Sequence, residues 1–139
     1  MSVRKGDRNE GQLQVLNLMR VLTLHTVQKC RSEKIFPKNA RWILCKPILD
    51  ECIAATVCVR RANAVYVGED SAAWRYRRNQ QIEAHSHIDA LLTLIDIAYN
   101  TFSIENDQMT YWISLCCEAD EKLKAWMKSD KERFGNLTR

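Results

Sequence analysis

Apolar residues recur every three or four positions along most of this 139-residue chain, which is the spacing of one face of an α-helix. The pattern predicts four helices, over about residues 11–32, 39–67, 71–101 and 107–128. Pro37 and Gly68 interrupt it between the first three, and Asn106 or Asp107 can cap the fourth helix. With only four glycines and two prolines, the chain has too few turn residues for a many-stranded protein, so we predict an all-α fold.

Each predicted helix has one seam of residues that should face a shared core. The seams are Val15, Met19, Leu22, Thr26 and Cys30; Trp42, Cys45, Leu49, Cys52, Thr56, Val59, Asn63 and Tyr66; Trp74, Gln81, Ile88, Leu91, Ile95, Ala98 and Phe102; and Met109, Trp112, Cys116, Ala119, Leu123 and Trp126. Pro47 lies inside the second helix, where it should cause a kink or set off a short first turn.

Short connections between amphipathic helices make neighbouring helices antiparallel. We therefore predict an up-down-up-down antiparallel four-helix bundle that forms a single domain over residues 1–139. Its core should cover about residues 11–128, with a flexible N-terminal arm at 1–10 and a C-terminal tail at 129–139 that frays.

Composition places the chain among ordinary globular proteins, with 46% hydrophobic residues, 27% charged residues and a formal net charge of +4. The first residues are charged and lack the apolar stretch of a signal peptide. No apolar run approaches the length of a membrane span. We expect a cytoplasmic protein with no membrane partner.

Arginine is concentrated around the glycine of one predicted turn, in the stretch VRRANAVYVGEDSAAWRYRRNQQ. The arginines are Arg60, Arg61, Arg75, Arg77 and Arg78. Guanidinium groups bind phosphate oxygens in pairs and stack on rings, so the cluster favours an anionic partner, with Trp74 and Tyr76 as stacking faces. Alternatively, this end is a solvated polar surface. In that case Arg77 or Arg78 pairs with Glu69, Asp70 or acids of the fourth helix, and Trp74 closes the core.

Sites for catalysis or metal binding are not evident. None of the six cysteines forms a Cys-x-x-Cys pair, so we expect small buried side chains. His85 with Asp89, and Glu83 with His87, give two possible metal ligands at a time, whereas a zinc site needs three or four. Glycine-rich phosphate loops and nucleophile elbows are also missing from the sequence. We expect no enzymatic activity, no cofactor and no metal.

Three stretches resemble a family of small bacterial four-helix-bundle proteins: KIFPKNARWILCKPILDECIAATVCVRRANAV, RRNQQIEAHSHIDALLTLIDIAYNTFSIENDQ and YWISLCCEADEKLKAWMKSD. The resemblance covers roughly residues 12–130 and rests on apolar and charged patterns. The family contains the accessory variability determinant proteins of diversity-generating retroelements and related bundle proteins encoded in ribosomal RNA intervening sequences.

The resemblance implies a homo-oligomeric ring, a pentamer, that binds the retroelement's reverse transcriptase and RNA or DNA during mutagenic copying. It implies no catalysis by the bundle itself. The family's basic surface would correspond to Arg60, Arg61, Arg75, Arg77 and Arg78, and its proline-basic turn to Lys38 and Arg41. The alternative hypothesis is a structural or protein-docking bundle with no nucleic-acid role.

Overall fold

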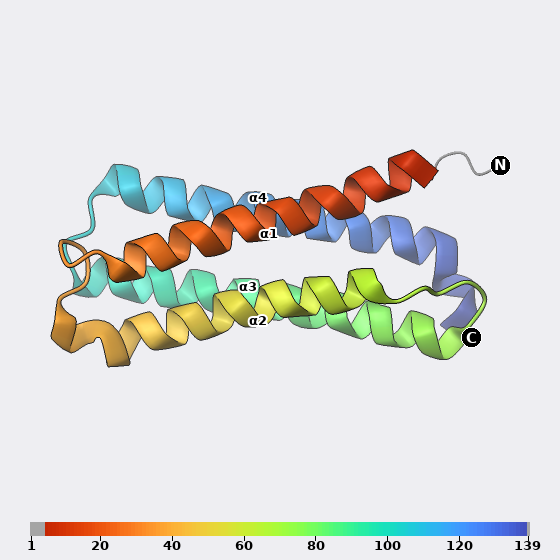
Figure 1. The fold of residues 1–139 in the computed structure, drawn as a ribbon, viewed down its shortest axis with the longest axis horizontal. Coiled ribbons are helices and arrows are strands. Elements are labelled where there is room, and N and C mark those ends of the chain that lie inside the picture. The colour runs from red at the N-terminus through yellow and green to blue at the C-terminus, as the bar shows by residue number, and fades with distance from the viewer. Residues whose placement is uncertain (1–4, 139) are drawn as a thin grey trace.

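Four long helices pack side by side in the computed structural model, which describes residues 5–138 (Figure 1). They are α1 (Lys5–Arg31), α2 (Lys46–Ala64), α3 (Ser71–Thr101) and α4 (Asn106–Phe134). Within this described part the chain forms no strand, which confirms the all-α prediction. The predicted N-terminal arm is too long, because the helix already begins at Lys5; residues 1–4 of that arm lie outside the described part.

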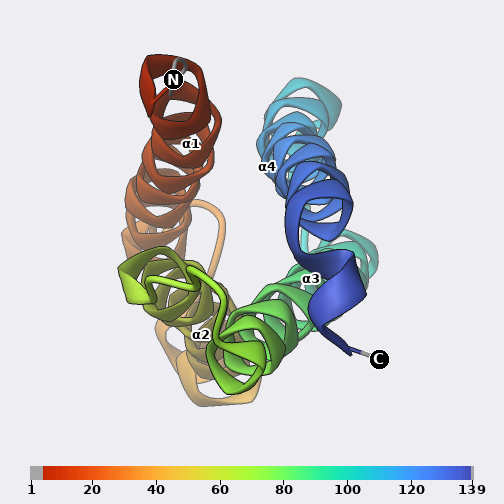
Figure 2. The same cartoon turned by 90° about the vertical axis from the view of Figure 1, so that its right-hand side faces the viewer.

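The four helices surround one core. The links from α1 to α2 and from α3 to α4 lie at one end of the molecule, and the α2–α3 turn lies at the other, together with the start of α1 and the end of α4 (Figure 1). Seen along the long axis, each helix occupies one corner (Figure 2). Helix α1 contacts α2 and α4, and α3 contacts the same two helices. This arrangement gathers the end of α2, the start of α3 and the end of α4 in one region.

The predicted seams of α1, α3 and α4 do face the core. Val15, Met19 and Leu22 are fully buried in α1, as are Ile88 and Leu91 in α3. Burial of such stripes removes apolar surface from water, and this is the main force that holds amphipathic helices together.

One polar residue of the predicted α1 seam has a partner in the core. Thr26 is fully buried, and its hydroxyl oxygen accepts a hydrogen bond of 3.0 Å from the indole Nε1 of Trp112. The bond joins α1 to α4 and satisfies two polar groups that would otherwise be costly to bury.

The second helical segment buries only part of its predicted seam, since Cys45, Cys52 and Val59 are buried as predicted. Trp42 and Tyr66, both assigned to the seam, are 79% and 90% exposed. The face that is fully buried or nearly so contains Ile48, Cys52, Ala55, Val59 and Ala62. The buried face and the predicted seam share Cys52 and Val59. Trp42 and Tyr66 lie beyond the two ends of α2, which explains why the core does not cover them.

The start of the second helical segment is irregular, as its proline predicts. A 3-10 turn at Lys38–Ala40 leads into a π-helical turn at Arg41–Cys45, and Pro47 is the second residue of α2. Proline has no backbone N–H to donate to the carbonyl four residues earlier, so the preceding turn cannot continue a regular α-helix. The expected short turn before Pro47 is confirmed.

The turn between α2 and α3 begins earlier than predicted, because α2 ends at Ala64 and Val65 is already extended. Gly68 has φ +52°, the left-handed conformation that favours glycine. A Cβ atom there would lie 2.9 Å from Cε2 of the exposed Tyr66 ring, which can move aside, so the backbone conformation is what favours glycine. Asp70 then caps α3, since its carboxylate accepts hydrogen bonds from the backbone N–H groups of Ala72 (2.9 Å) and Ala73 (3.3 Å).

Candidate nucleic-acid interface

The turn at Gly68 brings five predicted site residues to one end of the bundle. Arg60 and Arg61 lie in the last turns of α2, and Arg75, Arg77 and Arg78 lie in the first turns of α3 (Figure 1). Four of these side chains are exposed to solvent, and Arg77 is buried. The five arginines therefore do not form one equivalent set.

Arg77 is part of the core and is only 5% exposed. Its Nε donates to Asp130 Oδ2 at 2.7 Å, and its Nη2 donates to Asp130 Oδ1 at 3.0 Å, which makes a two-pronged ion pair. Its Nη1 donates to the backbone carbonyl of Val65 at 3.3 Å and so ties the turn to α3. The prediction that Arg77 lies on an exposed basic surface is wrong, because the side chain is buried against a carboxylate of α4.

Asp130 also receives hydrogen bonds from Gln81 and Arg133, and its side chain is fully buried. The Arg77 guanidinium lies 5.0 Å from the centre of the Trp126 ring, close enough for a cation–π contact. This network corrects the prediction of a frayed tail after residue 128, since α4 continues through Phe134. A buried ion pair cannot form without the helical turns that position it.

Arg60, Arg61, Arg75 and Arg78 form what we call the arginine face. Among residues 11–137, whose side chains the structure describes, none of the four has an acidic side chain within ion-pair distance. Arg75 and Arg78 share one face of α3, three residues apart. The nearby Asp70 carboxylate is occupied by the helix cap. These guanidinium groups remain free to bind phosphate or carboxylate oxygens.

Lys38 and Arg41 lie at the opposite end of the bundle, between α1 and α2. Each lies 3.7 Å from the same oxygen of Glu33. All three side chains are substantially exposed, so these contacts add little to stability. The structure does not bring Lys38 and Arg41 together with the arginine face.

Aromatic residues near the arginine face differ in how accessible they are. Trp74 is buried, and its ring centre lies 5.6 Å from that of Phe134, so it closes the core as the alternative interpretation predicted. Tyr76 is 44% exposed and Tyr66 is almost fully exposed. The stacking faces available at this end are therefore Tyr76 and Tyr66. The sequence pattern had assigned Tyr66 to the core.

Histidine side chains pair between helices instead of within α3. His85 Nδ1 lies 2.7 Å from Asp120 Oδ1, which joins α3 to α4. His87 Nδ1 lies 2.8 Å from Glu51 Oε2, which joins α3 to α2. Among the residues described, no three His, Cys, Asp or Glu side chains converge in a way that fits a metal ion.

All six cysteines are free thiols, and five of them are buried. Burial raises the pKa of the Cys116 thiol to about 12 and also raises the pKa of Cys52 above its ordinary value. Cys117 is exposed. The buried thiols act as small apolar side chains, as the sequence predicts.

Within the described residues, no helix combines the length and apolarity that crossing a membrane requires.

Comparison with known proteins finds no family model that matches the chain, and no characterised protein or solved structure with a significant match.

Proposed function

We propose that this protein is a non-enzymatic accessory protein of a diversity-generating retroelement. In this proposal it binds the reverse transcriptase and the template RNA or DNA through a basic surface and so supports mutagenic copying. The proposal starts from the resemblance of three segments to the accessory variability determinant family. It also includes an up-down-up-down bundle topology, a homopentameric ring and a cytoplasmic location.

The observation that supports nucleic-acid binding best is the arginine face. Four exposed guanidinium groups lie at one end of the bundle, and none has an acidic partner among the described side chains of residues 11–137. Like charges held close together repel, and a polyanion relieves that repulsion by binding. Contacts to phosphate supply most of the affinity for nucleic acid and do not depend on base sequence.

A ring would strengthen this surface. The net charge of +4 per chain is modest, but rotational symmetry repeats the same arginine face once in every subunit. Summed fields from several such faces raise the local concentration of an anionic strand. Multivalent contact would then give tighter binding than one chain alone.

Binding of a labelled single-stranded RNA, measured by fluorescence anisotropy at low salt, tests the proposal. The variant Arg60→Gln/Arg61→Gln/Arg75→Gln/Arg78→Gln should lose most of the affinity. A control that removes equal charge at the opposite end is Arg31→Gln/Lys34→Gln/Lys38→Gln/Arg41→Gln, and it should bind nearly as well as the parent protein. Equal losses in the two variants would mean that only net charge matters, and the arginine face would be rejected.

Exposed apolar side chains favour a second candidate function, protein docking without nucleic acid. Trp42 and Ile43, in the π-helical turn, are 79% and 71% exposed. Trp42 lines a groove between α1 and α2 together with Leu49 and Ile53. Large exposed apolar patches are typical of interaction surfaces. Two measurements on the parent protein and on Trp42→Ser/Ile43→Ser separate the two functions. Sedimentation reports protein association, and the RNA titration reports nucleic-acid binding.

A further inference from the structure

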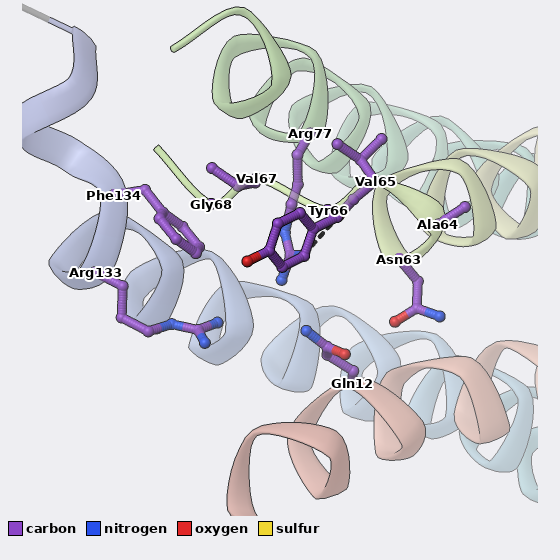
Figure 3. A pocket seen from close by; sticks show the side chains of 10 residues that line it. All are labelled: Gln12, Asn63, Ala64, Val65, Tyr66, Val67, Gly68, Arg77, Arg133 and Phe134. Carbon is purple, nitrogen blue, oxygen red and sulfur yellow. Dashed lines mark hydrogen bonds between the residues drawn. The ribbon is translucent and has the colours of Figure 1, made fainter. Parts of the chain in front are cut away.

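A second feature lies at the same end of the bundle, in a pocket of about 460 Å³ between the start of α1, the α2–α3 turn and the end of α4 (Figure 3). Its polar and aromatic lining comes from Gln12, Asn63, Tyr66, Arg77, Arg133 and Phe134. None of the four residues of the arginine face lines it. The volume falls within the usual range for small-molecule sites, about 300–1,000 Å³.

The pocket has an unbalanced positive charge. Arg77 and Arg133 both donate to Asp130, so two guanidinium groups share one carboxylate. The two Asp130 oxygens already accept four hydrogen bonds, because Gln81 donates as well. Asp130 is therefore saturated and cannot accept the remaining N–H groups of the two arginines.

Arg133 is the better placed of the two arginines to bind a ligand. Its buried Nε–H has no hydrogen-bond acceptor anywhere in the described chain, and its only hydrogen bond to a side chain there goes from Nη2 to Asp130. Its guanidinium carbon lies 5.0 Å from the centre of the Phe134 ring, which holds the group against an apolar surface. A buried donor without an acceptor is costly, and an anionic oxygen in the pocket would remove that cost.

The other walls can hold a planar group. Tyr66 folds over Gly68 with its ring beside the pocket and 90% of the residue exposed to solvent. Gln12 and Asn63 lie on the side away from Phe134, and their amide groups make no hydrogen bond to a side chain within residues 11–137 (Figure 3). An amide offers both a donor and an acceptor, which is how Asn and Gln side chains read the edges of bases.

We propose that this pocket binds a phosphate monoester joined to a planar, hydrogen-bonding group, and that a nucleoside 5′-monophosphate is the ligand class. The phosphate contacts Arg133 and Arg77, and the base lies against Tyr66 within reach of Asn63 and Gln12. This site goes beyond the proposed polyanion surface, because it recognises one nucleotide instead of a run of phosphates. The ligand is either a free nucleotide or the 5′-phosphorylated end of a nucleic-acid strand.

Isothermal titration of the full chain with the ribonucleoside 5′-monophosphates, adenosine and inorganic phosphate tests this inference. At least one monophosphate should bind, with both adenosine and inorganic phosphate weaker by about tenfold or more, since each lacks one half of the contacts. Absence of binding by every monophosphate at millimolar concentration would overturn the inference. Inorganic phosphate that binds as tightly as the nucleotide would also reject it.

Variants locate the site. Arg133→Gln keeps the Arg77–Asp130 pair and should weaken nucleotide binding about tenfold, whereas Arg20→Gln, an exposed residue of α1 outside both the pocket and the arginine face, should not. Tyr66→Ala removes a side chain that the core does not need and should also weaken binding, while Tyr76→Ala should have no effect. Unchanged affinity in both Arg133→Gln and Tyr66→Ala would contradict the proposed site.

The two sources of the ligand are separated with RNA oligonucleotides of one sequence that carry either a 5′-phosphate or a 5′-hydroxyl. Preference for the phosphorylated end that Arg133→Gln abolishes identifies a strand terminus as the ligand. Equal binding of the two, with nucleotide binding intact, identifies the free nucleotide. Arg133→Gln leaves the arginine face untouched, so failure of this inference is distinguishable from failure of RNA binding by that face.

Discussion

Asp130 accepts hydrogen bonds from side chains of both α3 and α4, although it follows the region in which helical periodicity is evident from sequence. Its partner Arg77 lies 53 positions earlier in the chain. Among the five clustered arginines, only this one points into the core, and the local sequence around it does not say so. Whether Arg77 or Arg78 is the buried residue depends on which face of α3 contacts α4.

Replacing Asp130 with asparagine should destabilise the fold strongly. The substitution keeps the shape but leaves the buried Arg77 charge without its counter-charge, and breaking a buried pair in this way costs about 3–5 kcal/mol. Urea denaturation followed by circular dichroism measures the change in the free energy of unfolding. The exposed neighbour Glu132→Gln is the matched control, with an expected change below about 0.5 kcal/mol. A loss of under 1 kcal/mol in Asp130→Asn would contradict the structural role.

Thiol labelling tests the burial of the cysteines. Under native conditions at pH 7.5, a maleimide should react quickly with Cys117 alone, because the other five thiols are buried. Burial also raises the pKa of Cys116 to about 12, so very little reactive thiolate exists there at this pH. Mass spectrometry should find one label per folded chain and six after denaturation. Cys117→Ser should remove the native label; rapid labelling of two or more sites would argue against this packing.

At the scale of single helices, α3 was predictable and α2 was predictable only in part. Helix α3 spans Ser71–Thr101, as its pattern indicates, because Gly68 and Asp70 mark its start and a single apolar stripe marks its buried face. In α2, Cys52 and Val59 of the predicted seam are buried, but Trp42 and Tyr66 are exposed because they lie beyond the ends of the helix. Small residues such as Ala55 and Ala62 also face the core, and their place there depends on how closely the neighbouring helices approach.

Truncation tests the end of α4. A chain that stops after Lys128 loses Asp130 and Phe134 and should unfold at a markedly lower temperature, by at least as much as Asp130→Asn. A chain that stops after Phe134 keeps both residues and loses only the final turn, so its melting temperature should stay close to that of the parent. Differential scanning calorimetry measures the melting temperatures of the parent protein and the two truncated chains. Equal stability of the parent and the shorter chain would restore the prediction of a dispensable tail.

At the scale of the whole molecule, the clustered arginines share one end of the bundle but differ in burial. The bundle brings five arginines to one end, buries Arg77 in an ion pair and leaves the four of the arginine face in solvent. The sequence indicates that the five arginines lie near one turn, because they flank Gly68. It could not predict which of them is buried, because that depends on the rotation of α3 about its own axis.

The salt dependence of RNA binding tests the central claim most directly. Each phosphate contact adds about 0.7 to the slope of log affinity against log salt for a single strand. The parent protein and the variant with Arg60, Arg61, Arg75 and Arg78 replaced by glutamine should therefore differ by about 3 in slope if all four make such contacts. Identical slopes in the two proteins, with equal affinity at low salt, would contradict the assignment of the arginine face to nucleic acid.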